Sequence, residues 1–192
     1  MSTSLHYLFL KWQAIALLLF NQKSAALGRF ESMLDLRPQD RYALASREHV
    51  LAQLDRRDEA IAAMEQLTVA HPGQASAWFN LGFMLEQDKQ YAKAEDAFGR
   101  ALQIDPKLDR AWYGLALVLI QDRRYDQAVV ALKKNTELQP MSPFGWYQLA
   151  RVHVDRQEPD EAVKIIRHLK GFEPKVAAQL ERETGLRIAQ SS

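Results

Sequence analysis

A fixed interval of 34 residues runs through this sequence of 192 residues. Five of its seven prolines keep the interval (72 − 38 = 34, and so on): Pro38, Pro72, Pro106, Pro140 and Pro174. Alanines keep it too: Ala26, Ala60, Ala94, Ala128 and Ala162. In the last three units it is also kept by Trp78, Trp112 and Trp146. Periods of about 20 to 50 residues mark architectures in which one structural unit is stacked in series. We therefore expect one continuous array, without a flexible linker.

Each unit is predicted to be a pair of helices joined by a tight turn. In the third unit, Trp78, Leu81 and Leu85 fall at i, i+3 and i+7, on one stripe of a helix from Ala75 to about Glu86. A second helix from about Tyr91 to Ile104 carries apolar residues at helical spacing. One such hairpin cannot bury its apolar face alone, so each unit is expected to pack on the next.

Proline and capping residues predict where the helices end and begin. Pro106 lacks an amide hydrogen and disfavours helical geometry in the residue before it, so the preceding helix should end there. The next helix is expected to begin near Asp109 as its N-cap. In the fifth unit, Ser142 followed by Pro143 is a preferred cap and first-turn pair.

The repeated residues resemble the motif of tetratricopeptide repeat proteins. In the third unit they are Trp78, Leu81, Gly82, Tyr91, Ala94, Phe98, Ala101 and Pro106. They recur as Trp112, Leu115, Ala116, Tyr125, Ala128, Leu132 and Pro140, and then as Trp146, Leu149, Ala150, Ala162, Ile166 and Pro174. The first two units match more sparsely, through Leu10, Ala14, Ala26, Phe30 and Pro38, and through Leu44, Ala60, Met64 and Pro72. The resemblance implies an all-α, right-handed superhelical α-α solenoid.

This resemblance predicts a single solenoid domain over residues 1–192. Its repeats are expected at about 7–40, 41–74, 75–108, 109–142 and 143–174, followed by a capping helix at about 175–189. Some positions depart from the family pattern, so helix spacing is expected to vary along the array. Glu48 stands where other units have a small residue, and Pro159 replaces the aromatic seen as Tyr91 and Tyr125. The slot of Ala101 holds larger residues elsewhere: Met33, Leu67, Asn135 and Leu169.

The two ends of the array are predicted to differ. In the C-terminal helix, Val176 and Leu180 are expected to pack on the fifth unit, while Glu181, Arg182 and Glu183 meet water. The first unit has no comparable polar cover, and its apolar residues exceed what one neighbouring helix can bury: Leu8, Phe9, Trp12, Ile15, Leu18 and Leu19. Self-association, insertion into a partner and contact with a membrane surface are the alternatives for this end.

In the family, the first helix of each pair lines a concave groove, and the resemblance places Phe79 and Phe83 inside it. The candidate partner-binding residues are Tyr42, His49, Phe79, Asn80, Phe83, Arg110, Tyr113, Leu117, Tyr147 and Arg151. Phe79, Asn80, Tyr113 and Tyr147 are common in the family, so packing between helices explains them equally well. Phe83, His49, Leu117 and Arg151 occupy variable slots and are better candidates for ligand contact. Arg110 and Arg151 suit an acidic side chain or a peptide terminus, and pairing with neighbouring carboxylates is their alternative role.

Some family members clamp the C-terminal carboxylate of heat-shock chaperones. We expect no such clamp here, because Phe83 and Leu117 occupy slots where asparagine is needed.

Composition excludes several other functions. Lysine and arginine number 25 against 24 acidic residues, so no global field favours nucleic acid. There is no cysteine, and the eight glycines and five histidines form no phosphate loop, GxSxG elbow or HExxH pair, so no catalytic site, metal or cofactor is predicted. The N-terminal segment lacks a basic stretch before its apolar part and has no membrane-length apolar run, which favours a cytoplasmic protein.

The sequence therefore predicts a non-enzymatic scaffold whose groove binds a peptide or helix of a partner protein. The alternative is a structural protein that assembles as a homodimer, or attaches peripherally to a membrane, through its apolar N-terminal repeat. An enzyme is the third and weakest reading, since no convergent pair of titratable groups stands out.

Overall fold

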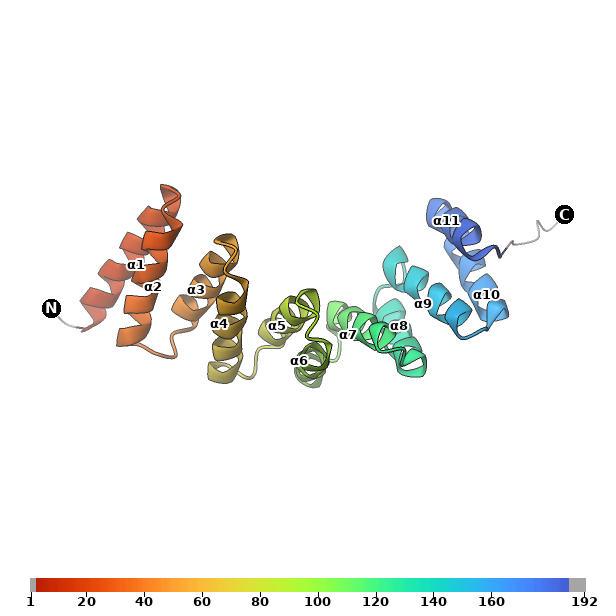
Figure 1. Ribbon diagram of the computed structural model, residues 1–192, viewed down its shortest axis with the longest axis horizontal. Helices are drawn as coiled ribbons and strands as arrows, with labels where there is room; N and C mark the ends of the chain where they lie inside the picture. Colours follow the sequence, from red (N-terminus) through yellow and green to blue (C-terminus); the bar gives the residue numbers. More distant parts are fainter. Residues whose placement is uncertain (1–2, 187–192) are drawn as a thin grey trace. The chain divides into compact units, whose positions relative to one another are not determined.

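The computed structural model describes residues 3–186, which form eleven α-helices and no strand (Figure 1). The helices are α1 (Thr3–Leu19), α2 (Lys23–Leu36), α3 (Arg41–Gln53), α4 (Arg57–Ala70), α5 (Ala75–Gln87), α6 (Tyr91–Ile104), α7 (Asp109–Gln121), α8 (Tyr125–Leu138), α9 (Pro143–Asp155), α10 (Pro159–Lys170) and α11 (Pro174–Thr184). The predicted all-α order of tandem helix pairs is confirmed. Among the described residues, no helix has the length and apolar character needed to span a bilayer.

The helices group into two compact units, the first ending at Leu85 and the second beginning at Glu86. In the first unit, α1 packs on α2, α2 on α3 and α3 on α4. In the second, each helix from α6 to α11 packs on the next, and α11 also contacts α9. Each unit is thus built from contacts between neighbouring helices, as expected for stacked hairpins. That residues 1–192 form one domain remains a prediction.

The alanines of the repeat lie in the cores of these units. Ala26, Ala60, Ala94, Ala128 and Ala162 are each at most 1% exposed. In the second unit, Ala128 on α8 belongs to a buried cluster with leucine, isoleucine and valine side chains, and Ala162 lies buried on the second helix of the next pair, α10. A methyl group at these positions lets paired helices approach closely, which explains why a small residue recurs there.

The turn inside each helix pair has the same backbone geometry in every repeat. Asn21, Asp55, Lys89, Arg123 and Gln157, again 34 residues apart, all have φ between 56° and 61°. After α7, the amide of Arg124 donates to the carbonyl of Leu119 at 2.9 Å, and the amide of Arg123 donates to that of Ile120 at 3.0 Å. These two bonds define a Schellman motif, which stops a helix with one left-handed residue.

A second repeated contact joins α5, α7 and α9, each the first helix of its pair, to the proline that precedes it. The indole Nε1 atoms of Trp78, Trp112 and Trp146 donate to the carbonyl oxygens of Pro72, Pro106 and Pro140, at 2.9, 2.9 and 2.8 Å. The tryptophans and prolines that keep the interval in the sequence are therefore joined in space. This bond satisfies a carbonyl in the loop and a polar group on a half-buried ring.

One predicted helix cap is wrong and another is confirmed. The N-cap of α7 is Leu108, not Asp109, and the carbonyl of Leu108 accepts from the amides of Ala111 and Trp112 at 2.9 and 3.4 Å. Ser142 is the N-cap of α9 and Pro143 lies in its first turn, as predicted, although the side chain of Ser142 makes no capping hydrogen bond. A side-chain cap does occur at α3, where Asp40 accepts from the amide of Ala43 at 2.9 Å.

Asp40 also joins α3 to α1. The hydroxyl of Tyr7 donates to its carboxylate at 2.8 Å, and the guanidinium of Arg37 lies 4.2 Å from the centre of the Tyr7 ring. Burial and this hydrogen bond to Asp40 raise the pKa of Tyr7 to about 12.

Candidate partner-binding surfaces

In the second unit, a polar cluster joins α9 to the C-terminal helix α11. Tyr147 and Arg151 lie one turn apart on α9, so their side chains share a face. The hydroxyl of Tyr147 donates to the carboxylate of Glu183 on α11 at 2.6 Å. The guanidinium of Arg151 lies 3.4 Å from that hydroxyl, and the amide of Gln179 donates to the other oxygen of Glu183 at 2.8 Å. The Glu183 carboxylate therefore accepts from two neutral donors, and the guanidinium of Arg151 contacts one of them, the Tyr147 hydroxyl.

This arrangement shifts the ionisation of both partners. The hydrogen bond from Tyr147, followed by that from Gln179, lowers the pKa of Glu183. The hydrogen bond to Glu183, followed by burial, raises the pKa of Tyr147. Both shifts favour a neutral phenol donating to a carboxylate anion. The surface thus presents the chemistry needed to hold an anionic oxygen.

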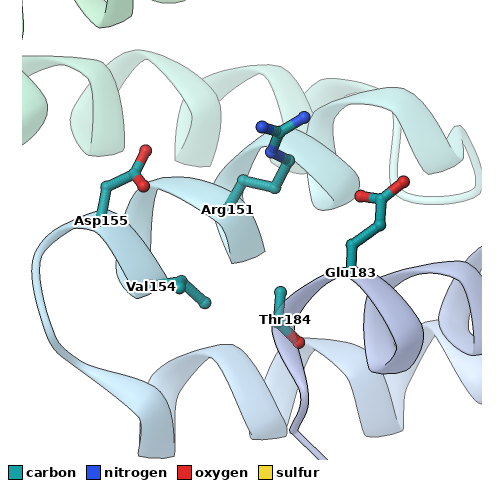
Figure 2. A pocket seen from close by; sticks show the side chains of 5 residues that line it. All are labelled: Arg151, Val154, Asp155, Glu183 and Thr184. Carbon is teal, nitrogen blue, oxygen red and sulfur yellow. The ribbon is translucent and has the colours of Figure 1, made fainter.

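A hollow of about 320 Å³ opens beside this cluster. Figure 2 shows Arg151, Val154 and Asp155 of α9 on one side and Glu183 and Thr184 of α11 on the other. One cation, two carboxylates, a hydroxyl and an aliphatic side chain thus surround it. Such a mixture suits a peptide segment that offers both charge and a small apolar group.

The other predicted residues of the second unit lie on α7. Arg110 is exposed, whereas Tyr113 and Leu117 are half-buried. Tyr113, like Tyr147, packs against the buried core of this unit. Both tyrosines therefore contribute to packing, the alternative role considered from the sequence, while keeping part of their surface in solvent. Their assignment to a binding groove remains a prediction.

In the first unit, Tyr42 and His49 lie on α3, where Tyr42 is exposed and His49 is accessible to solvent. The ammonium of Lys11 on α1 lies 4.4 Å from the centre of the Tyr42 ring, a cation–π contact. A ring nitrogen of His49 lies 2.7 Å from the side-chain nitrogen of Gln53, one turn away. Both predicted residues are therefore accessible, and each already contacts a neighbour within the unit.

Helix α5 carries the remaining three predicted residues. Phe79 is half-buried and Asn80 is exposed. Phe83 is 53% exposed, so it is not sealed in the interior of the protein. A phenylalanine left half in solvent is a candidate anchor for a partner, since fully burying such a side chain stabilises a complex by about 1.5 to 3 kcal/mol.

The sequence missed Glu183 as a member of a site. The sequence predicts that Glu183 meets water. Glu183 is exposed, and it also accepts a hydrogen bond from Tyr147. Glu181, predicted in the same way, is half-buried, with a carboxylate oxygen 3.7 Å from the ammonium of Lys170. The prediction for Leu180 is confirmed, because it is fully buried. The 34-residue interval offered a signal, since it makes α11 a further first helix beside α9.

Two family models match the sequence. The model described as "Tetratricopeptide repeat" matches residues 49–109, and the one described as "Anaphase-promoting complex, cyclosome, subunit 3" matches residues 87–169. The comparison with curated proteins found no match.

Solved structures with the same fold cover nearly the whole chain. A crystal structure of MamA superposes with a TM-score of 0.76 at 19% identity, covering 97% of this chain and 98% of that one. YrrB, described as "a TPR protein with an unusual peptide-binding site", gives 0.75 at 18% identity, covering 88% of both chains. PilF of Pseudomonas aeruginosa gives 0.65 at 19% identity, covering 95% and 92%. Fold and repeat motif together define a solenoid of helical hairpins. The chain is a tetratricopeptide repeat protein.

Proposed function

We propose that this protein is a non-enzymatic scaffold that binds a peptide segment of a partner protein on the first helices of its repeats. The observation that carries the proposal is the carboxylate of Glu183, which accepts hydrogen bonds from Tyr147 and Gln179, with the guanidinium of Arg151 3.4 Å from the Tyr147 hydroxyl. A surface that holds one carboxylate of its own chain has the donors to hold a carboxylate of another. Charge-assisted bonds of this kind are about twice as strong as neutral ones.

The ligand class follows from the residues around the hollow. Arg151 offers a guanidinium for an acidic side chain or a free C-terminus, and Val154 offers a short apolar contact. The exposed edges of Tyr113 and Tyr147 add aromatic surface on α7 and α9. The expected ligand is therefore an acidic peptide that also carries an apolar or aromatic residue. The peptide-binding site described for YrrB supports this class of function for a chain of the same fold.

An immobilised peptide array tests this proposal. The array carries peptides in which acidic and aromatic residues are varied independently, and the full chain is applied to it. The wild type should retain peptides that combine both kinds of residue. Arg151→Glu should weaken their binding at least 10-fold, since it reverses the charge at the hollow. Arg167→Glu is the matched control, because Arg167 is an exposed arginine of α10 away from this surface.

The result that would reject the proposal is equal loss of binding in the two variants, or unchanged binding in Arg151→Glu. Circular dichroism checks that both variants keep their helices. Phe83→Ala in the first unit asks separately whether α5 contributes an anchor. No catalytic step and no cofactor are part of the proposed function. A cytoplasmic location remains a prediction from the sequence.

A further inference from the structure

One face of α1 is apolar and exposed along its whole length. Phe9 is 54% exposed, Trp12 67% and Leu19 81%, and Phe20, directly after the helix, is 77% exposed. Leu8 and Ala16 are exposed on the same side. At 100° per residue these six positions fall within an arc of roughly 120°, opposite the buried Tyr7, Leu10 and Ala14. The exposed residues therefore form one continuous stripe, which we call the α1 stripe.

The size of its residues distinguishes the α1 stripe from the equivalent surface of later repeats. The counterpart of Phe9 in α9 is Gly145, where an added Cβ would stand 2.1 Å from Oδ1 of Asn135 on the preceding helix α8. The counterpart of Trp12 in α7 is Gly114, where a Cβ would stand 2.5 Å from the ring of Phe98 on α6. The slot of Phe9 is small in the four later repeats, as Ala43, Ala77, Ala111 and Gly145, whereas the slot of Trp12 holds Ser46, Asn80, Gly114 and Gln148.

Phe9 would collide with a helix packed in that way. A further hairpin of the same kind, joined in the same geometry, therefore cannot cover the α1 stripe. The slots carry bulky aromatic side chains, which are typical anchors of protein interfaces. The occupant must then meet the stripe in a different packing mode.

Charge favours a second copy of this chain over a lipid surface. Lys11 is the one residue of α1 with a full charge at neutral pH, and it lies over Tyr42 of α3, outside the stripe. Helices that bind in the membrane interface are rich in lysine and arginine along their polar face, and α1 has a single lysine and no arginine. Two uncharged stripes can meet without repulsion, and a two-fold axis presents each stripe with an identical one.

The exposed area is also large enough for a dimer. A fully buried aromatic side chain removes about 150 to 250 Å² from solvent, so Phe9, Trp12 and Phe20 with the two leucines leave on the order of 600 Å² exposed. Specific protein interfaces bury about 600 to 1,000 Å² on each partner. We propose that this protein forms a homodimer in which the α1 stripe of one chain packs on the α1 stripe of a second copy, with Trp12 as its central anchor. This inference does not depend on peptide binding at Arg151.

Sedimentation velocity of the full chain over a concentration series tests the dimer. The wild type should sediment as a dimer at micromolar concentration, and Trp12→Glu should weaken the dimer roughly 100-fold or more, because the change occurs in both copies. Phe144→Glu is the matched control, since Phe144 is an apolar residue of α9 that is 69% exposed, and it should leave the dimer intact. Circular dichroism should show equal helix content in all three proteins, because both residues are mostly solvated.

Two further results would overturn the proposal. One is a wild-type monomer throughout the series, whether or not it floats with liposomes of neutral or anionic lipid. The other is a dimer that persists in Trp12→Glu. A positive check uses the absence of native cysteine. Chains carrying Ala16→Cys and chains carrying Leu8→Cys are mixed and oxidised. They should cross-link in the wild-type background and fail to do so when Trp12→Glu is added. Cross-linking at equal yield in both backgrounds would also contradict the proposal.

Discussion

The ring of Phe98 on α6 fills the space that a side chain on Gly114 of α7 would need. A Cβ on Gly114 would lie 2.5 Å from Cζ of Phe98, whose side chain is buried and only 1% exposed. The bulky Phe98 of one hairpin thus packs against the site where Gly114 of the next hairpin has no side chain. The distance between α6 and α7 is set by this pair.

Gly114→Ala should therefore destabilise the protein, although alanine favours a helix over glycine by about 1 kcal/mol. Overpacking of a filled core costs about 1 to 3 kcal/mol, so a net loss of roughly 1 to 2 kcal/mol is expected in urea unfolding. Gly99→Ala is the control within α6, because nothing lies within 4 Å of a Cβ added there. That variant should gain up to about 1 kcal/mol. Equal changes in the two variants would contradict this account of the contact.

Alkaline pH should weaken the protein through Tyr7. Its pKa of about 12 in the folded state exceeds the unfolded value of about 10, so the unfolded chain releases this proton first as pH rises. The stabilising contribution is complete below pH 10 and is lost as pH approaches 12, with a slope of about 1.4 kcal/mol per pH unit. Urea midpoints measured between pH 9 and 11.5 give this slope.

Tyr7→Phe supplies the comparison, because other tyrosines and the lysines also titrate in this range. The difference in unfolding free energy between wild type and variant should shrink as pH rises above 10. A difference that stays constant to pH 11.5 would mean that the bond to Asp40 does not hold the phenol in its neutral form.

The sequence predicted the helices well because the interval that spaces prolines, alanines and tryptophans is also the interval of the fold. It did not reveal the left-handed residues, although they keep the same interval, because none is a glycine and Lys89, Arg123 and Gln157 have no preference for that conformation. Packing of the two helices in each pair imposes that backbone geometry, and no shared residue preference at these positions indicates it. The N-cap at Leu108 was missed for a similar reason, since a backbone carbonyl and the Trp112–Pro106 bond fix the start of α7.

Arg123→Gly should stabilise the protein at one of these turns. A left-handed conformation costs a residue with a side chain about 1 to 2 kcal/mol. Glycine adopts it without this strain, but it gives up more conformational entropy on folding, which costs about 0.5 to 1 kcal/mol. The net gain expected in thermal or urea unfolding is roughly 0.5 to 1 kcal/mol. Arg123→Val, with a branched Cβ at φ 56°, should instead lose about 1 kcal/mol or more. A valine variant as stable as the glycine variant would show that the turn relaxes to another geometry.

At the candidate site, sequence reasoning found Arg151 and Tyr147 but not what they contact. Their slots lie on the first helix of a repeat, which the family resemblance marks as the binding face. Glu183 lies 36 residues beyond Tyr147, on a helix whose sequence departs from the motif, so its approach to α9 depends on how α11 packs. Side-chain contacts between separate helices follow from packing, which the periodic pattern does not encode.

Because Glu183 occupies the donors that an incoming carboxylate would use, its removal should strengthen the binding of acidic peptides. In the wild type a peptide carboxylate must displace that of Glu183 from Tyr147, and it meets a site whose positive charge is already partly neutralised. Glu183→Ala removes this competitor, and an acidic peptide with an aromatic residue should bind several-fold to about 10-fold more tightly in titration calorimetry. Glu161→Ala controls for the change in net charge, since Glu161 is an exposed acid paired with Lys164 on α10. Equal gains in peptide affinity in the two variants would assign the effect to overall charge. Weaker peptide binding to Glu183→Ala would mean that this carboxylate positions Tyr147 for the ligand and does not compete with it.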